Sequence, residues 1–377
     1  MIRLSRLERL ASNLLLAAGS SLLVMLAAEA GLRMFRPVQY LKPPDPEKVR
    51  NAEESLYRPA TAPGLSYEMV PDRNGVFEGM HVRTNHFGLR GPEPSPQAAH
   101  RFRVAALGDS FTFGFGVEEK ETFPSVLQDL LNRSPSASGQ WFEVMNFGVV
   151  GYSTRDEAIV LEKKALGFHP QGIIIGYVLN DPEIDPRLSL HKYFDPPVWW
   201  RRSHLLRLLH LGWNTVQVWI HGGGDYLRYL HAPGGEKWRS VEAGFRSIRR
   251  MADREGAWTL VAIFPLTPET SWENYPYSDL HAQVAREARA NGFQVVDLLG
   301  PFRRIPPVKL RLSETDDHPS PLGHRIAAEA IYEAIVSGSW SGALTAGGGG
   351  PSDGMGRSPR RVDSHASHSL SFSAMAP

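Results

Sequence analysis

The sequence of 377 residues contains no cysteine, which removes disulfide bonds, thiolate metal sites and cysteine nucleophiles together. It also lacks an excess of charge, because 41 Lys and Arg residues face 40 Asp and Glu residues and leave a formal net charge of +1. Without a basic field, nucleic acid is not an expected partner. The absence of cysteine fits a periplasmic chain as well as a cytosolic one, so it does not decide the compartment.

Common cofactor motifs are missing as well. The segment from Gly108 to Gly116 lacks the lysine of a phosphate-binding P-loop, and its glycine spacing does not match the dinucleotide fingerprint. Several histidines lack the tight spacing of metal ligands and are expected to be solvated or packed: His191, His204, His210, His221 and His231. The sequence therefore predicts no cofactor and no metal.

What the chain does have is a long uncharged run at residues 10–28, which is mostly Leu, Ala and Val. As a helix this run would measure roughly 28 Å, close to the bilayer hydrocarbon thickness of about 30 Å. Arg3, Arg6 and Arg9 before the run favour an N-inside orientation, although Arg33 and Arg36 after it weaken that bias. Residues 1–36 are therefore predicted to be a single-pass anchor in an inner membrane, with the rest of the chain periplasmic.

Two other interpretations of residues 1–36 stay open. The triplet Ala28-Glu29-Ala30 resembles a small-x-small cleavage site, which would make the segment a removable signal peptide. A buried helix of a soluble protein is the third interpretation. The basic flank favours targeting over this last one.

The segments on either side of the centre differ from it in composition. Residues 37–100 are rich in proline and charge, contain a short candidate strand at Met80–Arg83, and are expected to form an extended lead segment that is not an independent domain. Residues 339–377 consist largely of Gly, Ser, Pro and His and are expected to be a disordered tail, because they cannot bury enough surface to offset the entropy of ordering.

Residues 101–338 alternate short apolar runs with amphipathic segments, a pattern typical of a parallel sheet covered on both faces. The expected strands are 104–107, 142–145, 172–176, 258–264 and 293–298, and the expected helices are 124–132, 154–166, 241–255 and 280–291. The fold class is therefore α/β, a three-layer α/β/α sandwich around a parallel sheet of about five strands. An insertion at about 185–236, rich in Trp, Leu, Arg and His, interrupts the alternation.

The first apolar run leads directly into Gly108-Asp109-Ser110, which places a serine at the carboxyl end of a parallel strand. Ligands bind at such ends in open α/β sheets, and a strand-to-helix turn leaves a serine accessible to a base and to a substrate. Taken alone, the tripeptide is more typical of an ordinary helix N-cap serine. Ser110 becomes a candidate nucleophile only together with other segments.

Three such segments follow in order: Asn146-Phe147-Gly148-Val149-Val150-Gly151, then Asn180-Asp181, then Asp316-Asp317-His318. With Gly108-Asp109-Ser110 they make the chain from about Arg101 to Ser337 resemble the SGNH (GDSL) hydrolase family, which implies a flavodoxin-like fold and no cofactor. The resemblance implies Ser110 as the nucleophile. It also implies an oxyanion hole formed by the Ser110 amide, the Gly151 amide and the Asn180 side chain. Such donors stabilise the charge that develops on the carbonyl oxygen in acyl transfer.

The same resemblance implies His318 as the general base, but the acid departs from the family pattern. The family places its aspartate three residues before the histidine, and Thr315 occupies that position. We prefer Asp316, because an adjacent residue tends to point away from its neighbour, and we keep Asp317 as the alternative acid. His324, at the start of the last expected helix, is expected to be structural.

The predicted function is an esterase-type hydrolase that forms an acyl-enzyme on Ser110 and acts on an ester of a carbohydrate, lipid or cell-envelope polymer. An O-acyltransferase with the same residues is the first alternative, and an inactive polysaccharide-binding or assembly factor is the second. The phrase from Asn85 to Glu93 resembles that of a bacterial subgroup of single-pass, membrane-anchored members. Within the insertion, the segment from Trp199 to Leu230 is predicted to cover the Ser110 pocket, with a membrane-facing surface and extra core as the alternatives.

Overall fold

The computed structural model describes residues 6–35, 56–77, 79–98, 100–134, 140–182, 194 and 199–337. The predicted tail 339–377, residues 36–55 and most of the first part of the predicted insertion lie outside these residues. The membrane run falls on α1 (Arg6–Phe35), which is long and apolar enough to cross a bilayer from Arg9 to Phe35. Length and composition alone fit a signal sequence equally well.

The centre of the molecule is a five-stranded parallel sheet in the order β6-β5-β7-β8-β9. Its strands are β5 (Arg101–Gly108), β6 (Trp141–Asn146), β7 (Gly172–Tyr177), β8 (Trp258–Ile263) and β9 (Gln294–Asp297). Each contains one of the predicted apolar runs, within a few residues at either end. Four of the five strands, all but the edge strand β9, are almost fully buried, which is why they appear as continuous apolar runs and not as an alternating pattern.

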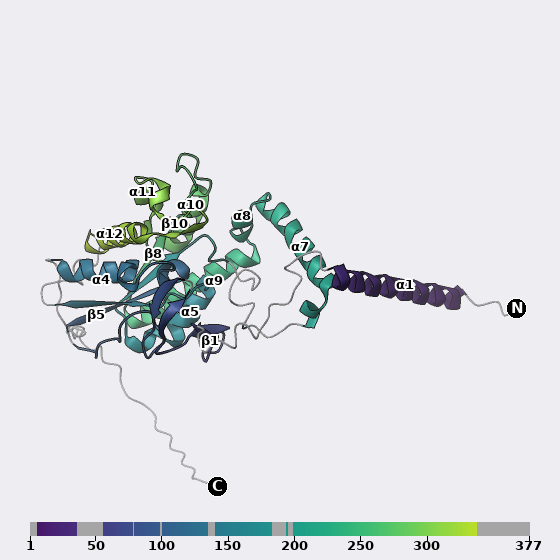
Figure 1. Ribbon diagram of the computed structural model, residues 1–377, viewed down its shortest axis with the longest axis horizontal. Coiled ribbons are helices and arrows are strands. Elements are labelled where there is room, and N and C mark those ends of the chain that lie inside the picture. The colour runs from purple at the N-terminus through teal and green to yellow at the C-terminus, as the bar shows by residue number, and fades with distance from the viewer. Residues whose placement is uncertain are drawn as a thin grey trace, which may run out of the picture.

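Helices cover both faces of the sheet and complete the predicted three layers (Figure 1). One core contains Val104, Ala106 and Ile174 of the sheet and packs against α3 (Ser110–Phe113), α4 (Phe123–Arg133), α11 (Leu299–Phe302) and α12 (Pro321–Ser337). The other contains Ala105, Leu107 and Ile173 and packs against α5 (Thr154–Lys163), α9 (Glu236–Glu255) and α10 (Ser278–Ala290). Neighbours along a strand serve opposite cores because successive side chains point to opposite faces.

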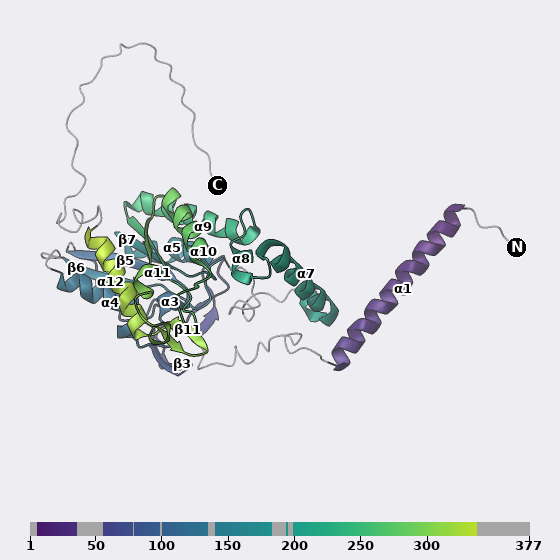
Figure 2. The ribbon, with the colours of Figure 1, turned by 90° about the horizontal axis from the view of Figure 1, so that it is seen from above.

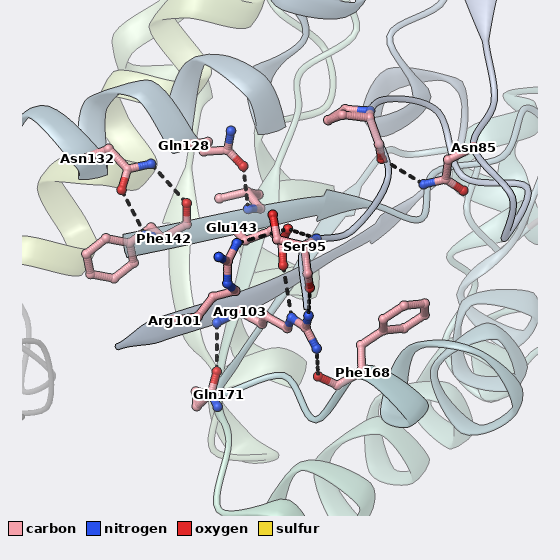
Figure 3. Close-up of polar contacts among 12 residues, drawn as sticks. Asn85, Ser95, Arg101, Arg103, Gln128, Asn132, Phe142, Glu143, Phe168 and Gln171 are labelled. Carbon is pink, nitrogen blue, oxygen red and sulfur yellow. Dashed lines mark hydrogen bonds and ion pairs between the residues drawn. The ribbon is translucent and has the colours of Figure 1, made fainter. Parts of the chain in front are cut away.

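The predicted lead segment forms two antiparallel hairpins, β1 (Tyr57–Pro59) with β2 (Tyr67–Met69) and β3 (Asn74–Phe77) with β4 (Met80–Arg83). Tyr67 is fully buried in the core that contains Ala105, Leu107 and Ile173, so the segment packs on the sheet domain. A second attachment lies at the amino ends of the strands, where Arg103 donates to Glu143 at 2.9 Å and to the carbonyl of Ser95 (Figure 3). Because Arg103 and Glu143 are both buried and paired, this network has a structural role at the edge opposite Ser110.

The described part of the insertion consists of η5 (Trp199–Arg202), α7 (His204–Gly222) and α8 (Tyr226–Leu230). The prediction that this segment covers Ser110 is wrong for the described residues, because α7 extends away from the sheet toward α1 in both views (Figures 1 and 2). The alternative of extra core is wrong for α7 as well, since Gly222 is its one buried residue. Connectivity fixed where the insertion begins, but it did not fix the direction in which the helix continues.

Short elements complete the described chain. They are the 3-10 turns η2 (Glu119–Glu121), η4 (Ala165–Phe168) and η6 (Pro307–Lys309), and a hairpin of β10 (Arg311–Ser313) with β11 (Asp316–Pro319). The expected helix 154–166 therefore ends as α5 at Lys163 and continues as η4. The β10–β11 hairpin carries the histidine motif back to the sheet.

Candidate active site

Ser110 follows β5, at the point where the strand order of the sheet reverses. The chain passes from β5 to β6 on one side and then to β7 on the other, and ligands of open α/β sheets bind in the crevice at such a point. The predicted segments after β5, β6 and β7 therefore meet at one edge. Asp109 begins α3 by accepting the Phe111 amide at 2.8 Å, which leaves Ser110 as the first helical residue.

The structure brings Ser110, His318 and Asp316 into one hydrogen-bonded row. Ser110 Oγ lies 2.8 Å from Nε2 of His318, and Nδ1 of the same ring lies 2.6 Å from Oδ1 of Asp316. The Asp316 carboxylate also accepts the His318 amide at 3.0 Å, so one oxygen fixes both the ring and the backbone of the histidine. These distances are those at which a carboxylate orients an imidazole and the imidazole receives a hydroxyl proton.

The pleat of β11 explains why Asp316, and not Asp317, contacts the ring. Residues two apart on a strand point to the same face, whereas adjacent residues point to opposite faces. Asp316 and His318 are two apart on β11, so their side chains share a face, and the Asp317 carboxylate lies within 4.8 Å of the Asp316 carboxylate and of a His318 ring nitrogen. Among the described residues, the Asp317 carboxylate has no hydrogen bond to His318.

Aromatic rings enclose the histidine. Phe115 and Phe111 flank His318 with ring centroids 4.7 and 5.3 Å away. Ser110 is only 6% exposed, while Asn180 beside it is exposed to solvent. The row is therefore held in an apolar wall with one open, polar side.

The three predicted oxyanion donors follow β5, β6 and β7, whose carboxyl ends lie at one edge of the sheet. Gly151 follows β6 in a turn with φ of +78°, a conformation that favours glycine, and Asn180 follows β7. Among the described residues, the Ser110 and Gly151 amides donate to no acceptor. The Asn180 amide nitrogen donates to Oδ2 of Asp109, the neighbour of Ser110, at 3.3 Å. Two free amides and one oriented side-chain amide can together receive a developing oxyanion.

A close backbone contact sets the position of the Gly151 loop against α3. A Cβ on Gly148 would lie 2.2 Å from the Phe113 nitrogen, so only glycine allows this approach. Asn146 joins the same two segments, because its side chain donates to the Thr112 carbonyl at 2.9 Å and accepts the Gly148 amide at 2.9 Å. The predicted segment after β6 thus serves as a support for α3 as well as a source of Gly151.

Sequence reasoning missed a further support, Arg90 of the lead segment. Arg90 is buried and donates to the carbonyls of Phe113, Gly114 and Val117 in the loop that follows Ser110. Asn85 shapes the loop that delivers it, by accepting the Phe87 and Leu89 amides at 3.0 Å. In the sequence, the segment from Asn85 to Glu93 is identified only by its resemblance to a subgroup. Its structural role depends on the contact of Arg90 with Phe113, which is distant in sequence.

Three buried carboxyl groups, those of Asp109, Asp181 and Glu157, lie close enough to one another to interact electrostatically. Burial raises the pKa of Asp109 to about 6, and burial raises the pKa of Asp181 and of Glu157 well above their usual range. Each of the three carboxyl groups also raises the pKa of a neighbour through charge repulsion. Glu157 has no hydrogen-bond partner among the described residues, so it is the member best suited to stay neutral.

The remaining candidates lie outside the row. His324 is fully buried, where its Nδ1 accepts the Phe123 amide at 3.2 Å, in keeping with the predicted structural role. Among the described residues, the one cluster with the composition of a metal site is Asp316, Asp317 and His318. Both ring nitrogens of His318 already contact Asp316 and Ser110, so this arrangement suits proton transfer more than metal ligation.

The three-layer fold with a serine, a histidine and an aspartate in a row at its strand ends defines an α/β protein of the serine hydrolase type. Residues 106–326 match the family model described as the GDSL-like Lipase/Acylhydrolase family, which covers more than half of the chain. The protein belongs to this family, and it is a hydrolase that acts on esters. No curated protein matches the sequence.

Solved structures with a related fold are distant in sequence. TesA is 16% identical, with coverage of 62% of this chain and 97% of TesA and a TM-score of 0.40. Axe2, an acetylxylan esterase from Geobacillus stearothermophilus, is 17% identical, with coverage of 63% and 95% and a TM-score of 0.40. A two-domain esterase active on acetylated mannans is 13% identical, with coverage of 65% and 50% and a TM-score of 0.40.

Proposed function

We propose that the protein is a membrane-anchored esterase that forms an acyl-enzyme on Ser110 and acts on an ester of a carbohydrate, lipid or cell-envelope polymer. The observation that carries this proposal is the hydrogen-bonded row of Ser110, His318 and Asp316. The row lies at the edge of the sheet where the segments with Gly151 and Asn180 leave their strands. The arrangement provides a nucleophile, a base, an orienting acid and donors for an oxyanion.

In the proposed reaction, Ser110 Oγ attacks the ester carbonyl carbon while its proton passes to Nε2 of His318. Asp316 accepts a hydrogen bond from Nδ1–H of His318 and stabilises the imidazolium that forms. The carbonyl oxygen gains negative charge between the Ser110 and Gly151 amides and the Asn180 side chain. When the tetrahedral intermediate collapses, the imidazolium returns the proton to the leaving alcohol, and water then releases the acyl group by the same steps.

Hydrolysis is favoured over transfer to a sugar hydroxyl by the openness of the site. The Asp316 and His318 side chains are 32% and 23% exposed, so water reaches the base without displacement of a cover. An acyltransferase has to exclude water from its acyl-enzyme, and no described residue closes this side. The non-catalytic alternative rested on the displaced aspartate, and Asp316 contacts His318 despite its unusual spacing.

The proposed location is an inner membrane crossed once by α1, with the catalytic domain on the periplasmic side. The charge-free run of α1 and the arginines before it support this placement. The proposed partners are the membrane, through residues 10–28, and an ester-bearing small molecule or envelope polymer.

A fluorophosphonate probe tests the proposal, because it reacts with an activated serine. We expect the full chain to be labelled and the Ser110→Ala variant to remain unlabelled. In parallel, an acetylated oligosaccharide should yield free acetate, and addition of an unacetylated acceptor should leave the acetate yield unchanged. A chain that is not labelled would contradict the enzymatic proposal, and acetate that moves onto the acceptor would replace esterase by transferase.

A further inference from the structure

One long face of α7 is apolar and exposed. It contains Leu208, Leu209, Trp213, Val216, Trp219 and Ile220, which are between 37% and 68% exposed. Their spacing of three, four and seven residues places them along one side of the helix, and no charged residue interrupts them. Exposure of such a wide apolar face to water is unfavourable, so this face is expected to bind a membrane or another molecule.

The opposite face of α7 is polar. Arg207, His210, Asn214, Gln217 and His221 follow the same helical spacing about half a turn away from the apolar residues. All but His221 are half-buried. Among helices that bind membranes, one with an apolar and a polar side lies along the membrane surface and does not cross the bilayer. Consistent with this, α1 is the one helix of the described residues that is long and apolar enough to span a membrane.

The amino end of α7 is fixed to the carboxyl end of α1. The Glu29 carboxylate accepts the amides of His204 at 3.0 Å and Leu205 at 2.8 Å, as well as the Ser203 hydroxyl at 2.9 Å. Arg33 pairs with the same carboxylate at 2.7 Å and donates to the Arg202 carbonyl at 3.2 Å. A carboxylate on free amides at a helix start is a stable arrangement. Glu29 is the first charged residue after the apolar run, so α7 begins where that run leaves the hydrocarbon.

We infer that α7 lies in the plane of the membrane interface, with the face from Leu208 to Ile220 inserted into the outer leaflet of the bilayer that α1 crosses. The bilayer is favoured over a second protein copy because the apolar face continues directly from the end of α1. Tryptophan side chains such as Trp213 and Trp219 prefer this depth, where the ring meets acyl chains and the ring nitrogen meets water. The inference rests on α1 as a membrane anchor.

The inferred contact also orients the catalytic domain. α7 continues into α8, whose Arg228 binds Asp279 of α10 at 2.6 Å and the Pro276 carbonyl at 2.7 Å. Just after α8, His231 lies 2.9 Å from the Tyr177 hydroxyl at the end of β7. The domain is therefore joined to the bilayer at two places, α1 and α7, and a two-point attachment restricts its rotation about the anchor.

The cysteine-free chain offers a direct test. Single-cysteine variants Val216→Cys and Ile220→Cys of the full chain are labelled with an environment-sensitive fluorophore and reconstituted into vesicles of phosphatidylcholine and phosphatidylglycerol. Val308→Cys is the matched control, because Val308 is 66% exposed on η6 of the catalytic domain. Leu16→Cys reports separately on α1. Fluorophosphonate labelling of Ser110 checks that each variant is folded.

The expected result is a blue-shifted emission at positions 216 and 220, with quenching by lipids that carry a nitroxide near the headgroup about threefold stronger than at position 308. If aqueous iodide quenches positions 216 and 220 as strongly as position 308 while position 16 lies in lipid, the inference is overturned and the anchor stays intact. A blue shift without lipid quenching would assign the face to a protein contact, and stronger quenching from the bilayer centre would make α7 a second span. Both would overturn the inference. A water-exposed position 16 would reject the anchor itself.

Discussion

Two aspartates precede His318, and one of them is hydrogen-bonded to its ring. Asp316 holds Nδ1 of the ring, whereas the nearby Asp317 carboxylate makes no hydrogen bond to His318 among the described residues. We expect Asp316→Ala to lower turnover of a short acyl ester by roughly two to four orders of magnitude, because the ring loses its orientation and the charge that stabilises it. Asp317→Ala is the control one residue away and should change turnover by less than about threefold. Equal losses in steady-state assays would remove Asp316 from its proposed role.

Asn180 is the one proposed oxyanion donor that would act through its side chain. Asn180→Ala should lower turnover by about two to three orders of magnitude, since a fixed donor to a developing oxyanion is worth roughly 3 kcal/mol. The exposed Asn74→Ala on β3 is the control and should leave turnover unchanged. The thermal midpoint should stay the same in both variants. If Asn180→Ala keeps its turnover, the donor has to be sought elsewhere.

At this scale the sequence predicted those residues whose positions follow from strand ends. Ser110, Gly151 and Asn180 each follow a continuous apolar run, and the carboxyl ends of parallel strands meet at one edge. The supporting residues could not be predicted in the same way. Arg90 reaches carbonyls more than twenty positions away, and the contact of Asp109 with Asn180 joins two different strand ends. Only the geometry of the folded chain brings these pairs together.

At the scale of elements, the position of α3 depends on the loop after β6. Gly148→Ala would place a methyl group within 2.2 Å of the Phe113 nitrogen, and this neighbour is backbone that cannot rotate away. We expect α3 to shift and fluorophosphonate labelling of Ser110 to slow by at least about tenfold, since misplacement of a nucleophile by about 1 Å is costly.

Gly167→Ala is the matched control for that variant, because no atom lies within 4 Å of a methyl group there. It should label at the rate of the unmodified chain. Unchanged labelling of Gly148→Ala would show that the loop yields and that α3 is held by other contacts.

The elements also differ in how well the sequence predicted them. Four of the five sheet strands are almost fully buried, so each of them appears as an unbroken apolar run. Strands β1 to β3 have three or four residues and no clear alternation, and only β4 was predicted among the hairpins. The mixture of Trp, Leu and polar residues in α7 predicted an insertion, but it did not predict where this helix lies. The apolar face of α7 packs against no core, so core packing does not determine the position of the helix.

For the whole molecule, two buried histidines make stability depend on pH. Burial lowers the pKa of His324 to about 3 and that of His231 to about 4. The unfolded chain takes up their protons near pH 6.5, so acidification below that value favours the unfolded chain, and folding stability falls as the pH falls toward these values. The raised pKa of buried Asp109 acts in the opposite direction, since it favours the folded chain as the pH falls below about 6.

A variant isolates the contribution of His324. The unfolding free energy of the unmodified chain should fall between pH 7.5 and pH 5 by roughly 2 kcal/mol more than that of His324→Asn, which cannot take up a proton. Denaturant unfolding of the full chain in detergent micelles at the two pH values measures this difference. His231 and the buried carboxyls are present in both proteins and cancel. The same pH dependence in both would refute a neutral, buried His324.

The topology of the whole chain is tested by a reporter fused after Pro377. With Arg3, Arg6 and Arg9 on the cytoplasmic side, α1 should place the catalytic domain and the reporter in the periplasm. Alkaline phosphatase, which folds only there, should be active in the fusion, and a reporter that works only in the cytoplasm should be inactive. The reverse pattern would contradict the proposed orientation.

The acid and the base of the site share one short hairpin, β10 with β11, whose pairing is irregular between its two paired positions. If this hairpin lifts, His318 and Asp316 leave Ser110 in a single event, while the parallel sheet keeps every strand. Catalytic competence then follows a local opening equilibrium, whose free energy is smaller than that of global unfolding. On heating, we expect ester turnover to disappear before the far-ultraviolet circular dichroism of the sheet changes, and to return as soon as the sample cools.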